Sequence, residues 1–211
     1  MFDEIQDPAQ RKRARAALLV AAVASAALFI PSSPTVASQI AGFSFNRPVE
    51  ITNTYSRLKA DVMWASSFPY QGVFLWRNNG SLSQEFDALE TSDGYFRLRA
   101  RHSGQCLMLD SRQSTYRNGT PVVQLPHCGR RSAEWRVRTV GDKVRNDGGV
   151  GTTTGGVYPT LQNRYTKRCL DAANDRGGRP PERAVLTQWA CIRSAQAGNA
   201  GNQLFSVRNV P

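Results

Sequence analysis

Residues 161–171 read LQNRYTKRCLD, and the same pattern occurs twice more in the chain. Residues 98–108, LRARHSGQCLM, share its cysteine and leucines, and residues 51–61, ITNTYSRLKAD, share its asparagine, tyrosine and final aspartate. Internal repetition of this kind indicates units that pack on one another, because none of them can bury its apolar face alone. Each copy continues to a second apolar segment and ends on a large aromatic side chain: Phe86, Trp135 or Phe205.

Apolar residues in these units alternate with polar ones and do not follow a helical period. Phe96, Leu98 and Ala100 alternate with three arginines, and Trp135 and Val137 alternate with two more. This period of two is typical of half-buried strands, and the Asn-Gly and Asp-Gly pairs between them are typical of tight turns. The sequence therefore predicts an all-β chain, in which three units of roughly 45–55 residues pack around a pseudo-threefold axis.

The first 37 residues have the organisation of a signal peptide. Four basic residues between Arg11 and Arg15 precede an uncharged apolar run from Ala16 to Ile30, and small residues near Ala37 offer a cleavage position. That run is shorter than the about 20 residues that a membrane span needs. We therefore predict a signal peptide over residues 1–37, a secreted, extracellular protein and no membrane span in the mature form. An uncleaved N-terminal helix that anchors the chain in a membrane is the alternative.

Four cysteines repeat with the same spacing as the units that contain them. Cys106 and Cys128 are 22 residues apart, as are Cys169 and Cys191, and the second pair follows the first by 63 residues. In an exported protein this pattern predicts one internal disulfide in each of two units. A zinc site is the alternative, but no two cysteines have the short spacing that zinc ligands usually show. We therefore expect no metal.

The chain is strongly basic, with 27 lysine and arginine residues against 16 aspartate and glutamate residues, a net charge of +11 at pH 7. Guanidinium groups bind planar anions, so a polyanionic partner has to be considered, although a coding preference for arginine also explains the excess. Because export is predicted, we do not expect nucleic acid as the partner. The polyanion hypothesis depends on arginines of the predicted strands: Arg97, Arg99, Arg101, Arg136 and Arg138.

Three short motifs of the last unit occur in a characteristic order. They are Cys169-Leu170-Asp171, Trp189-Ala190-Cys191 and the segment from Asn202 to Phe205. This order resembles the Cys-Leu-Asp, Trp-x-Cys and Gln-x-Trp elements of the ricin B-type β-trefoil lectins. The resemblance covers residues 43–210, with repeats at about 47–91, 93–142 and 157–210. It implies a twelve-strand β-trefoil with up to three shallow sugar sites, one in each repeat.

The resemblance also implies which residues form those sites. A carboxylate accepts hydrogen bonds from sugar hydroxyls, an aromatic ring packs on the apolar face of a pyranose, and an amide both donates and accepts. Such open sites bind weakly one at a time, so the repeats act together. The third repeat has the most complete set, Asp171, Trp189, Asn202 and Gln203, and the first has Asp61, Trp76 and Gln84, with Ser83 in place of the asparagine.

The second repeat departs from the pattern at all three positions. Met108, Pro126 and Ala133 replace the aspartate, the tryptophan and the glutamine. This repeat is therefore predicted to have lost its sugar site, unless Asp110 substitutes for the missing carboxylate. The alternative for the other repeats is that Asp61 and Asp171 only anchor the turns that follow them.

Catalysis has little support in the sequence. A nucleophile needs a base within hydrogen-bond reach, and the only histidines are His102, at a repeat position occupied elsewhere by tyrosine, and His127, next to a cysteine that is predicted to be oxidised. We therefore predict a carbohydrate-binding protein that is not an enzyme, uses no cofactor and has a glycan or polysaccharide as its partner. The alternative function is that of a cell-binding or assembly subunit of a multi-subunit toxin similar to the cytolethal distending toxins.

Overall fold

Twelve short strands form the framework of the protein in a computed structural model that describes residues 42–45, 47–141, 157–174, 178–193 and 201–211. All of these residues belong to one compact unit, Pro34–Pro211. The predicted signal peptide over residues 1–37 lies outside the described residues. The strands are β1 Pro48–Asn53, β2 Lys59–Val62, β3 Val73–Trp76, β4 Phe86–Glu90, β5 Phe96–Ala100, β6 Cys106–Leu109, β7 Val122–Leu125, β8 Glu134–Gly141, β9 Val157–Asn163, β10 Cys169–Ala172, β11 Leu186–Trp189 and β12 Phe205–Asn209.

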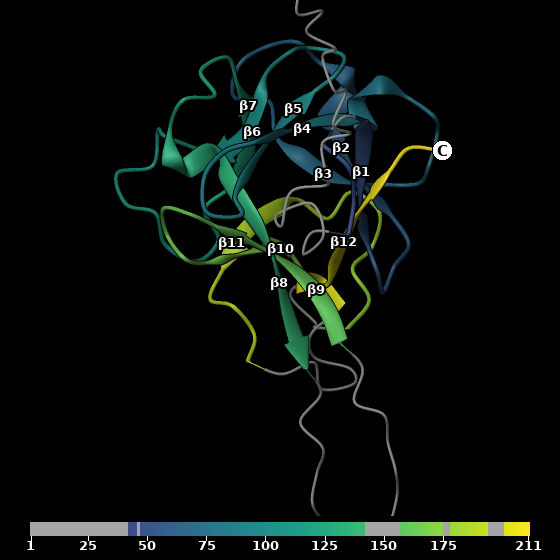
Figure 1. The fold of residues 1–211 in the computed structure, drawn as a ribbon, viewed down its shortest axis with the longest axis vertical. Helices are drawn as coiled ribbons and strands as arrows, with labels where there is room; N and C mark the ends of the chain where they lie inside the picture. The colour runs from purple at the N-terminus through teal and green to yellow at the C-terminus, as the bar shows by residue number, and fades with distance from the viewer. Residues whose placement is uncertain (1–41, 46, 142–156, 175–177, 194–200) are drawn as a thin grey trace, which may run out of the picture. The chain divides into compact units, whose positions relative to one another are not determined.

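The first and last strands of each repeat form a barrel. β12, β1, β4, β5, β8 and β9 pair in that order through antiparallel ladders (Figure 1). β9 and β12 are in contact, which closes the ring. Because a closed barrel has no free edges, short strands of five to eight residues are enough to build it.

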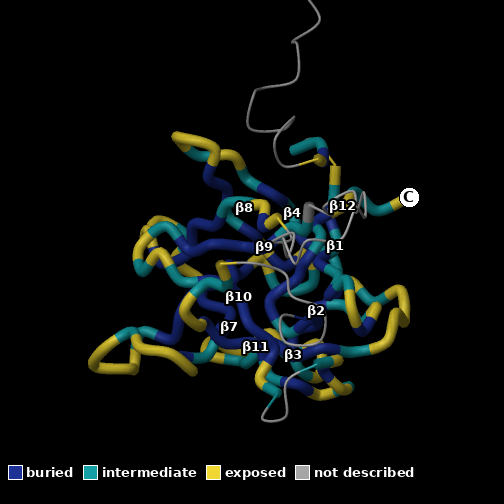
Figure 2. Tube along the Cα trace, turned by 90° about the horizontal axis from the view of Figure 1, so that it is seen from below, coloured by how far each residue is buried: buried dark blue, intermediate teal, exposed yellow. Residues whose placement is uncertain are grey.

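Alternate residues of the barrel strands point into a single core. The burial pattern along β1 changes at each residue from partly buried to buried, as the period of two in the sequence requires. Figure 2 shows the buried segments on the strands and most of the exposed ones on the loops. The three aromatic residues that end the repeated units all have side chains with almost no exposed surface: Phe86, Trp135 and Phe205.

The two middle strands of each repeat form a hairpin, and the three hairpins touch one another. β2 pairs with β3, β6 with β7 and β10 with β11. Isolated bridges connect each hairpin to the next, between Gly72 and Val123, between Pro121 and Thr187 and between Phe74 and Val185. Three four-stranded repeats around a pseudo-threefold axis make a β-trefoil, which confirms the predicted fold class.

Both predicted disulfides are present, one in the second repeat and one in the third. Cys106 pairs with Cys128 and Cys169 with Cys191, with Cα–Cα distances of 5.3 and 4.9 Å. In the first repeat the equivalent positions hold lysine and asparagine, and the lysine, Lys59, forms an ion pair with Glu50 of β1. Ordinary packing and this ion pair therefore replace the cross-link in the first repeat.

Helical structure in the described ranges is limited to single 3-10 turns. These are Met63–Ala65, Leu82–Gln84, Arg131–Ala133 and Gly201–Gln203. None of them, and no other helix among the described residues, is long and apolar enough to cross a membrane. The last three of these turns precede β4, β8 and β12, where they place the glutamine positions of the repeats beside the hairpins.

Candidate functional site

Asp171 of the third repeat lies in β10, a strand whose four side chains are all buried. Gln203 Nε2 donates a hydrogen bond to Asp171 Oδ2 at 2.9 Å, and Asn202 Nδ2 donates to the same oxygen at 2.8 Å. The Gln203 amide is itself fixed, because Nε2 also donates to the Ala190 carbonyl and Oε1 accepts from the Ile192 N–H, both at 3.0 Å. The structure thus brings together the three polar residues that the sequence assigned to this site.

Trp189 ends β11 beside this carboxylate, and its side chain is 46% exposed. β10 and β11 pair so that Asp171 faces Thr187 across the hairpin. A cleft of about 680 Å³ is lined by Asp171, Trp189, Thr187 and both amides of the following turn, and by Gly119 from the second repeat. A sugar ring in this cleft would meet an aromatic face and a buried carboxylate at the same time.

Burial raises the pKa of Asp171 to about 6, and the hydrogen bonds from Gln203 and Asn202 offset part of that rise. Both hydrogen bonds that this carboxylate accepts in the described part of the structure end on Oδ2. No described residue donates to Oδ1. Oδ1 is therefore the atom that can accept a hydrogen bond from a hydroxyl in the cleft, as a carboxylate oxygen once the pH exceeds about 6.

The first repeat contains the same aspartate–glutamine pair. Gln84 Nε2 donates to Asp61 Oδ2 and to the Arg77 carbonyl, both at 2.8 Å. Gln84 Oε1 accepts from the Asn79 N–H at 3.1 Å. Burial raises the pKa of Asp61, and hydrogen bonds from Ser83 and Gln84 offset part of the rise. In the first and third repeats, the pair therefore ties the hairpin to the turn that follows, whether or not a ligand is bound.

The surroundings of that pair differ between the two repeats. Phe74 faces Asp61 across the first hairpin, where Thr187 faces Asp171 in the third. The Phe74 ring is only 5% exposed, and its centroid lies 5.4 Å from that of Trp76. A buried ring therefore occupies the place of a small hydroxyl beside the carboxylate of the first repeat.

Trp76, the aromatic residue predicted for the first repeat, is half-buried and in contact with cations. The guanidinium carbons of Arg77 and Arg183 each lie 5.5 Å from the centre of its ring. Among the described residues, no such cation stacks on Trp189. The first repeat thus has its aspartate, glutamine and tryptophan in place, but its tryptophan is packed against arginine side chains where Trp189 is open.

The second repeat has replaced the polar pair with a small apolar cluster. Met108 and Ala133, at the aspartate and glutamine positions, are 1% and 0% exposed. Asp110 does not take over the missing role, because the Arg112 guanidinium donates to both of its carboxylate oxygens at 2.7 to 3.2 Å and lowers its pKa. Met108 and Ala133 pack with the disulfide and the apolar side chains around it: Cys106, Val123, Leu125 and Cys128.

The arginines on the strands of the second repeat are mostly paired within the molecule. Arg97 donates to Glu134 at 2.8 Å, Arg99 donates to Asp87 at 2.9 Å, and Arg101 forms an ion pair with Glu85. Arg136 donates to the Gln162 side chain, and Arg138 to the Ile192 carbonyl. The guanidinium groups on which the polyanion hypothesis depends therefore already have partners within the protein.

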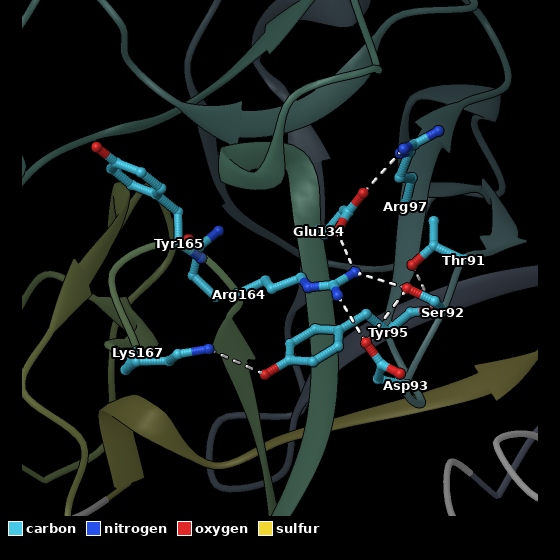
Figure 3. A network of polar contacts seen from close by, with 10 residues as sticks. Thr91, Ser92, Asp93, Tyr95, Arg97, Glu134, Arg164, Tyr165 and Lys167 are labelled. Carbon is cyan, nitrogen blue, oxygen red and sulfur yellow. Dashed lines mark hydrogen bonds and ion pairs between the residues drawn. The ribbon is translucent and has the colours of Figure 1, made fainter.

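Figure 3 shows the centre of this arginine network, where the second repeat meets the third. Glu134 accepts from Arg97 and also from Arg164, and Arg164 reaches on to Asp93 at 2.7 Å. Burial would raise the pKa of Glu134, but the two arginines hold it below its ordinary value. The network therefore connects β5 and β8 to the turn after β9 and has a structural role.

Two residues that line or cover the candidate sites were missed in the sequence, Gly119 and Arg183. Each belongs to a different repeat from the tryptophan it approaches and is far from it along the chain. Phe74 and Thr187 both lie in the second apolar segment of their repeats, two residues before the tryptophan. Comparing the two at their shared repeat position would have shown that one site keeps a hydroxyl and the other a phenyl ring.

The fold is a β-trefoil of the kind found in lectins. The family model of the ricin-type beta-trefoil lectin domain-like proteins matches residues 43–125 and 82–189. The chain therefore belongs to this family, and the resemblance of the three motifs is confirmed. A search of curated protein sequences found no match.

Solved structures with the same fold include designed, binding and enzymatic proteins. The designed threefold-symmetric protein ThreeFoil superposes with a TM-score of 0.58 at 24% identity, over 77% of this chain and 99% of that chain. A ricin B-like lectin from Macrolepiota procera, solved with lactose, gives 0.54 at 14% identity, over 78% and 96%. An exo-beta-1,3-galactanase from Clostridium thermocellum gives 0.59 at 20% identity, over 78% of this chain but 30% of that chain.

These likenesses establish the fold, and the lectin fold indicates carbohydrate binding. The lectin neighbours favour a binding role over catalysis, and one neighbour is a galactanase of which the matching part is less than a third. The expectation of a non-enzymatic carbohydrate-binding protein thus agrees with the family. Which of the three repeats binds, and what it binds, has to be argued from the geometry of the sites.

Proposed function

We propose that this protein is a secreted carbohydrate-binding protein whose working site is the cleft of the third repeat. The observation that carries the proposal is the combination of an open indole with a buried carboxylate, one oxygen of which has no donor among the described residues. Trp189 is 46% exposed, and Asp171 Oδ1 accepts no hydrogen bond from the described residues. Neither of the other repeats has both features.

The mode of binding follows from these contacts. The apolar face of a pyranose packs on the Trp189 indole, while adjacent hydroxyls donate to Asp171 Oδ1. Asn202 Nδ2 and Gln203 Nε2 hold the other carboxylate oxygen, so the acceptor is already oriented before the sugar arrives. A fixed acceptor and a rigid ring lose little conformational entropy on binding.

Salt should have little effect on this binding. Stacking and hydrogen bonding to a buried carboxylate are much less screened than exposed charge pairs. The arginines of β5 and the one that follows it, Arg101, already have acidic partners: Glu134, Asp87 and Glu85. Binding that depends on a polyanion would, in contrast, fall steeply as salt is added.

Glycan-array binding at low and high salt tests the proposal. The array should include lactose, which the Macrolepiota procera lectin binds, together with acidic and neutral polysaccharides. We expect salt-resistant binding to a defined sugar that Asp171→Ala abolishes. Asp61→Ala is the matched control, because it removes the equivalent carboxylate of the first repeat and should leave the binding unchanged.

Two results would contradict the proposal. Binding that disappears in high salt and survives Asp171→Ala would move the search to a polyanion or protein partner. No binding to any glycan by the folded protein would remove the carbohydrate function itself. Recovery of a companion subunit with the exported protein would favour the toxin-subunit alternative, which stays a prediction, as does secretion through residues 1–37.

A further inference from the structure

The loop of each hairpin crosses to the hairpin of the following repeat and ends there on one residue with a left-handed backbone. These residues are Tyr70, Gly119 and Arg183, with φ of 65°, 82° and 66°. Their backbone N–H groups donate to the carbonyls of Gln124, Gln188 and Leu75 at 2.9, 2.8 and 2.8 Å. The three positions are therefore equivalent under the pseudo-threefold symmetry, and each belongs to one repeat while lying on the next.

The residue after each of them accepts a backbone hydrogen bond in return, and we call this pair of reciprocal hydrogen bonds the clasp. Thr120 O accepts from the Gln188 N–H, and Ala184 O accepts from the Leu75 N–H, both at 2.9 Å. Gln71 O accepts from Gln124 in the same way at 2.9 Å. Because both strands of the clasp are fixed by backbone hydrogen bonds, a side chain at the left-handed position starts from a defined place beside the neighbouring strand.

That place lies beside the tryptophan of the neighbouring repeat. In the first repeat, the Arg183 guanidinium lies 5.5 Å from the centre of the Trp76 ring. Beside the third repeat the equivalent residue is Gly119, and a Cβ built on it would lie 3.7 Å from Trp189 Cζ3, with no other described atom outside its chain neighbours within 4 Å. Any side chain longer than a methyl group would therefore begin in contact with the indole that forms the wall of the cleft.

We propose that the residue at this left-handed position decides whether the tryptophan of the next repeat is open to a sugar ring. Glycine at position 119 keeps Trp189 open, and arginine at position 183 covers Trp76. The second repeat, which has no sugar site of its own, thus supplies a specificity-determining residue to the third. The inference rests on the proposed carbohydrate function, but the covering of the indole can be measured without any sugar.

The backbone conformation explains why glycine suits the open site. A left-handed φ is accessible to glycine at little cost, whereas other residues adopt it with strain. Gly119 therefore both fits the clasp and leaves the indole bare. Arg183 accepts the same backbone conformation with a long side chain, and its stacking on Trp76 adds a cation–π contact that favours the covered state.

The test compares Gly119→Arg with Gly119→Ala. Both variants place a Cβ on the same left-handed backbone, so they share its strain, but only arginine can extend across the indole. In protein labelled with 5-fluorotryptophan, the four tryptophan signals can be assigned by single replacements with phenylalanine, and the solvent isotope shift of each signal reports its exposure. We expect Gly119→Arg to reduce the shift of Trp189, and Gly119→Ala to leave it near that of the wild type.

Binding to the glycan identified on the array provides the second measurement. Gly119→Arg should weaken it by about tenfold or more, as expected for an aromatic contact of this kind, and Gly119→Ala by less than about threefold. Equal exposure of Trp189 in Gly119→Arg and the wild type would overturn the inference. So would equal losses of binding in the two variants, because strain alone would then explain them.

The reciprocal change tests the same rule in the first repeat. Arg183→Gly combined with Arg77→Ala introduces the residues that stand at the equivalent positions around Trp189, namely Gly119 of the second repeat and Ala190 of the third. The solvent isotope shift of Trp76 should then rise towards that of Trp189, and an unchanged shift would overturn the inference. A wild-type protein that binds no glycan would contradict the proposed function alone, since these exposure measurements would still decide whether the position covers the indole.

Discussion

The third and first repeats of this trefoil share their polar anchor and differ in almost everything around it. Both hold a buried aspartate with a glutamine amide at 2.8 to 2.9 Å. The third repeat adds an open indole and a hydroxyl, where the first has a covered indole and a phenyl ring. The difference shows that the aspartate–glutamine pair belongs to the architecture of the repeat, and that the groups around it decide whether it also serves a ligand.

The largest expected difference between the two repeats is in stability, and it comes from the disulfide of the third repeat. Replacing Cys169 and Cys191 with serine should lower the free energy of unfolding by about 3 kcal/mol, because the bridge closes a loop of 22 residues in the unfolded chain. Replacing Lys59, which stands at the equivalent position of the first repeat, with methionine should cost about 1 kcal/mol. Denaturant unfolding measures both, and equal losses would show that the cross-link does not set the repeats apart.

Because the first and third repeats share the aspartate–glutamine pair, we expect loss of the glutamine to lower stability equally in both. Gln203→Leu and Gln84→Leu each remove the glutamine amide that donates to a buried aspartate, which should cost about 2–3 kcal/mol. Thermal or denaturant unfolding at pH 7 is the measurement. A loss confined to one repeat would mean that the pair is not the common structural element that the hydrogen bonds indicate.

Removing the indole should weaken glycan binding in the third repeat but not in the first. Trp189→Ala is expected to weaken glycan binding by about 2 kcal/mol, or roughly thirtyfold, a value typical of a central aromatic contact. Trp76→Ala should change binding little, because that ring is already packed against two guanidinium groups. Titration calorimetry with the same glycan compares the two. Strong loss in Trp76→Ala would assign binding to the first repeat instead.

Acid should weaken binding in the third repeat by at most tenfold per pH unit. A sugar that donates to Asp171 favours the carboxylate, so protonation below the pKa of about 6 competes with binding. At pH 5 the affinity should therefore be about tenfold lower than at pH 7.5. A variant with glutamine in place of His102 and His127 should keep this dependence, and its disappearance in that variant would attribute the effect to histidine.

The raised pKa of Asp171 has the opposite effect on the free energy of unfolding of the unliganded protein, which acid should increase. Asp171 binds a proton more tightly in the folded than in the unfolded chain, so its contribution to stability rises as the pH falls through 6 towards the ordinary value near 4. Asp171→Asn should remove that contribution. Unfolding curves between pH 4 and 7 for the variant and the wild type would show it as a difference in slope.

Repetition in the sequence determined the fold, the two disulfides and the positions of the aspartate, tryptophan and glutamine residues. Residues 51–61, 98–108 and 161–171 show the same local pattern, and each pattern forms the same turn and strand because it buries the same alternate side chains. Met108 and Ala133 also predicted that the second repeat lacks the polar pair, and the structure shows that an apolar cluster takes its place.

Tertiary structure alone decided which tryptophan is open. Trp76 and Trp189 occupy the same place in their repeats, and their own neighbours in the sequence do not reveal that Arg183 covers one and Gly119 adjoins the other. Those contacts join residues of different repeats through the clasp between hairpins, so they depend on how the three units pack. A local pattern specifies the unit, whereas the surface of each site is formed by two units together.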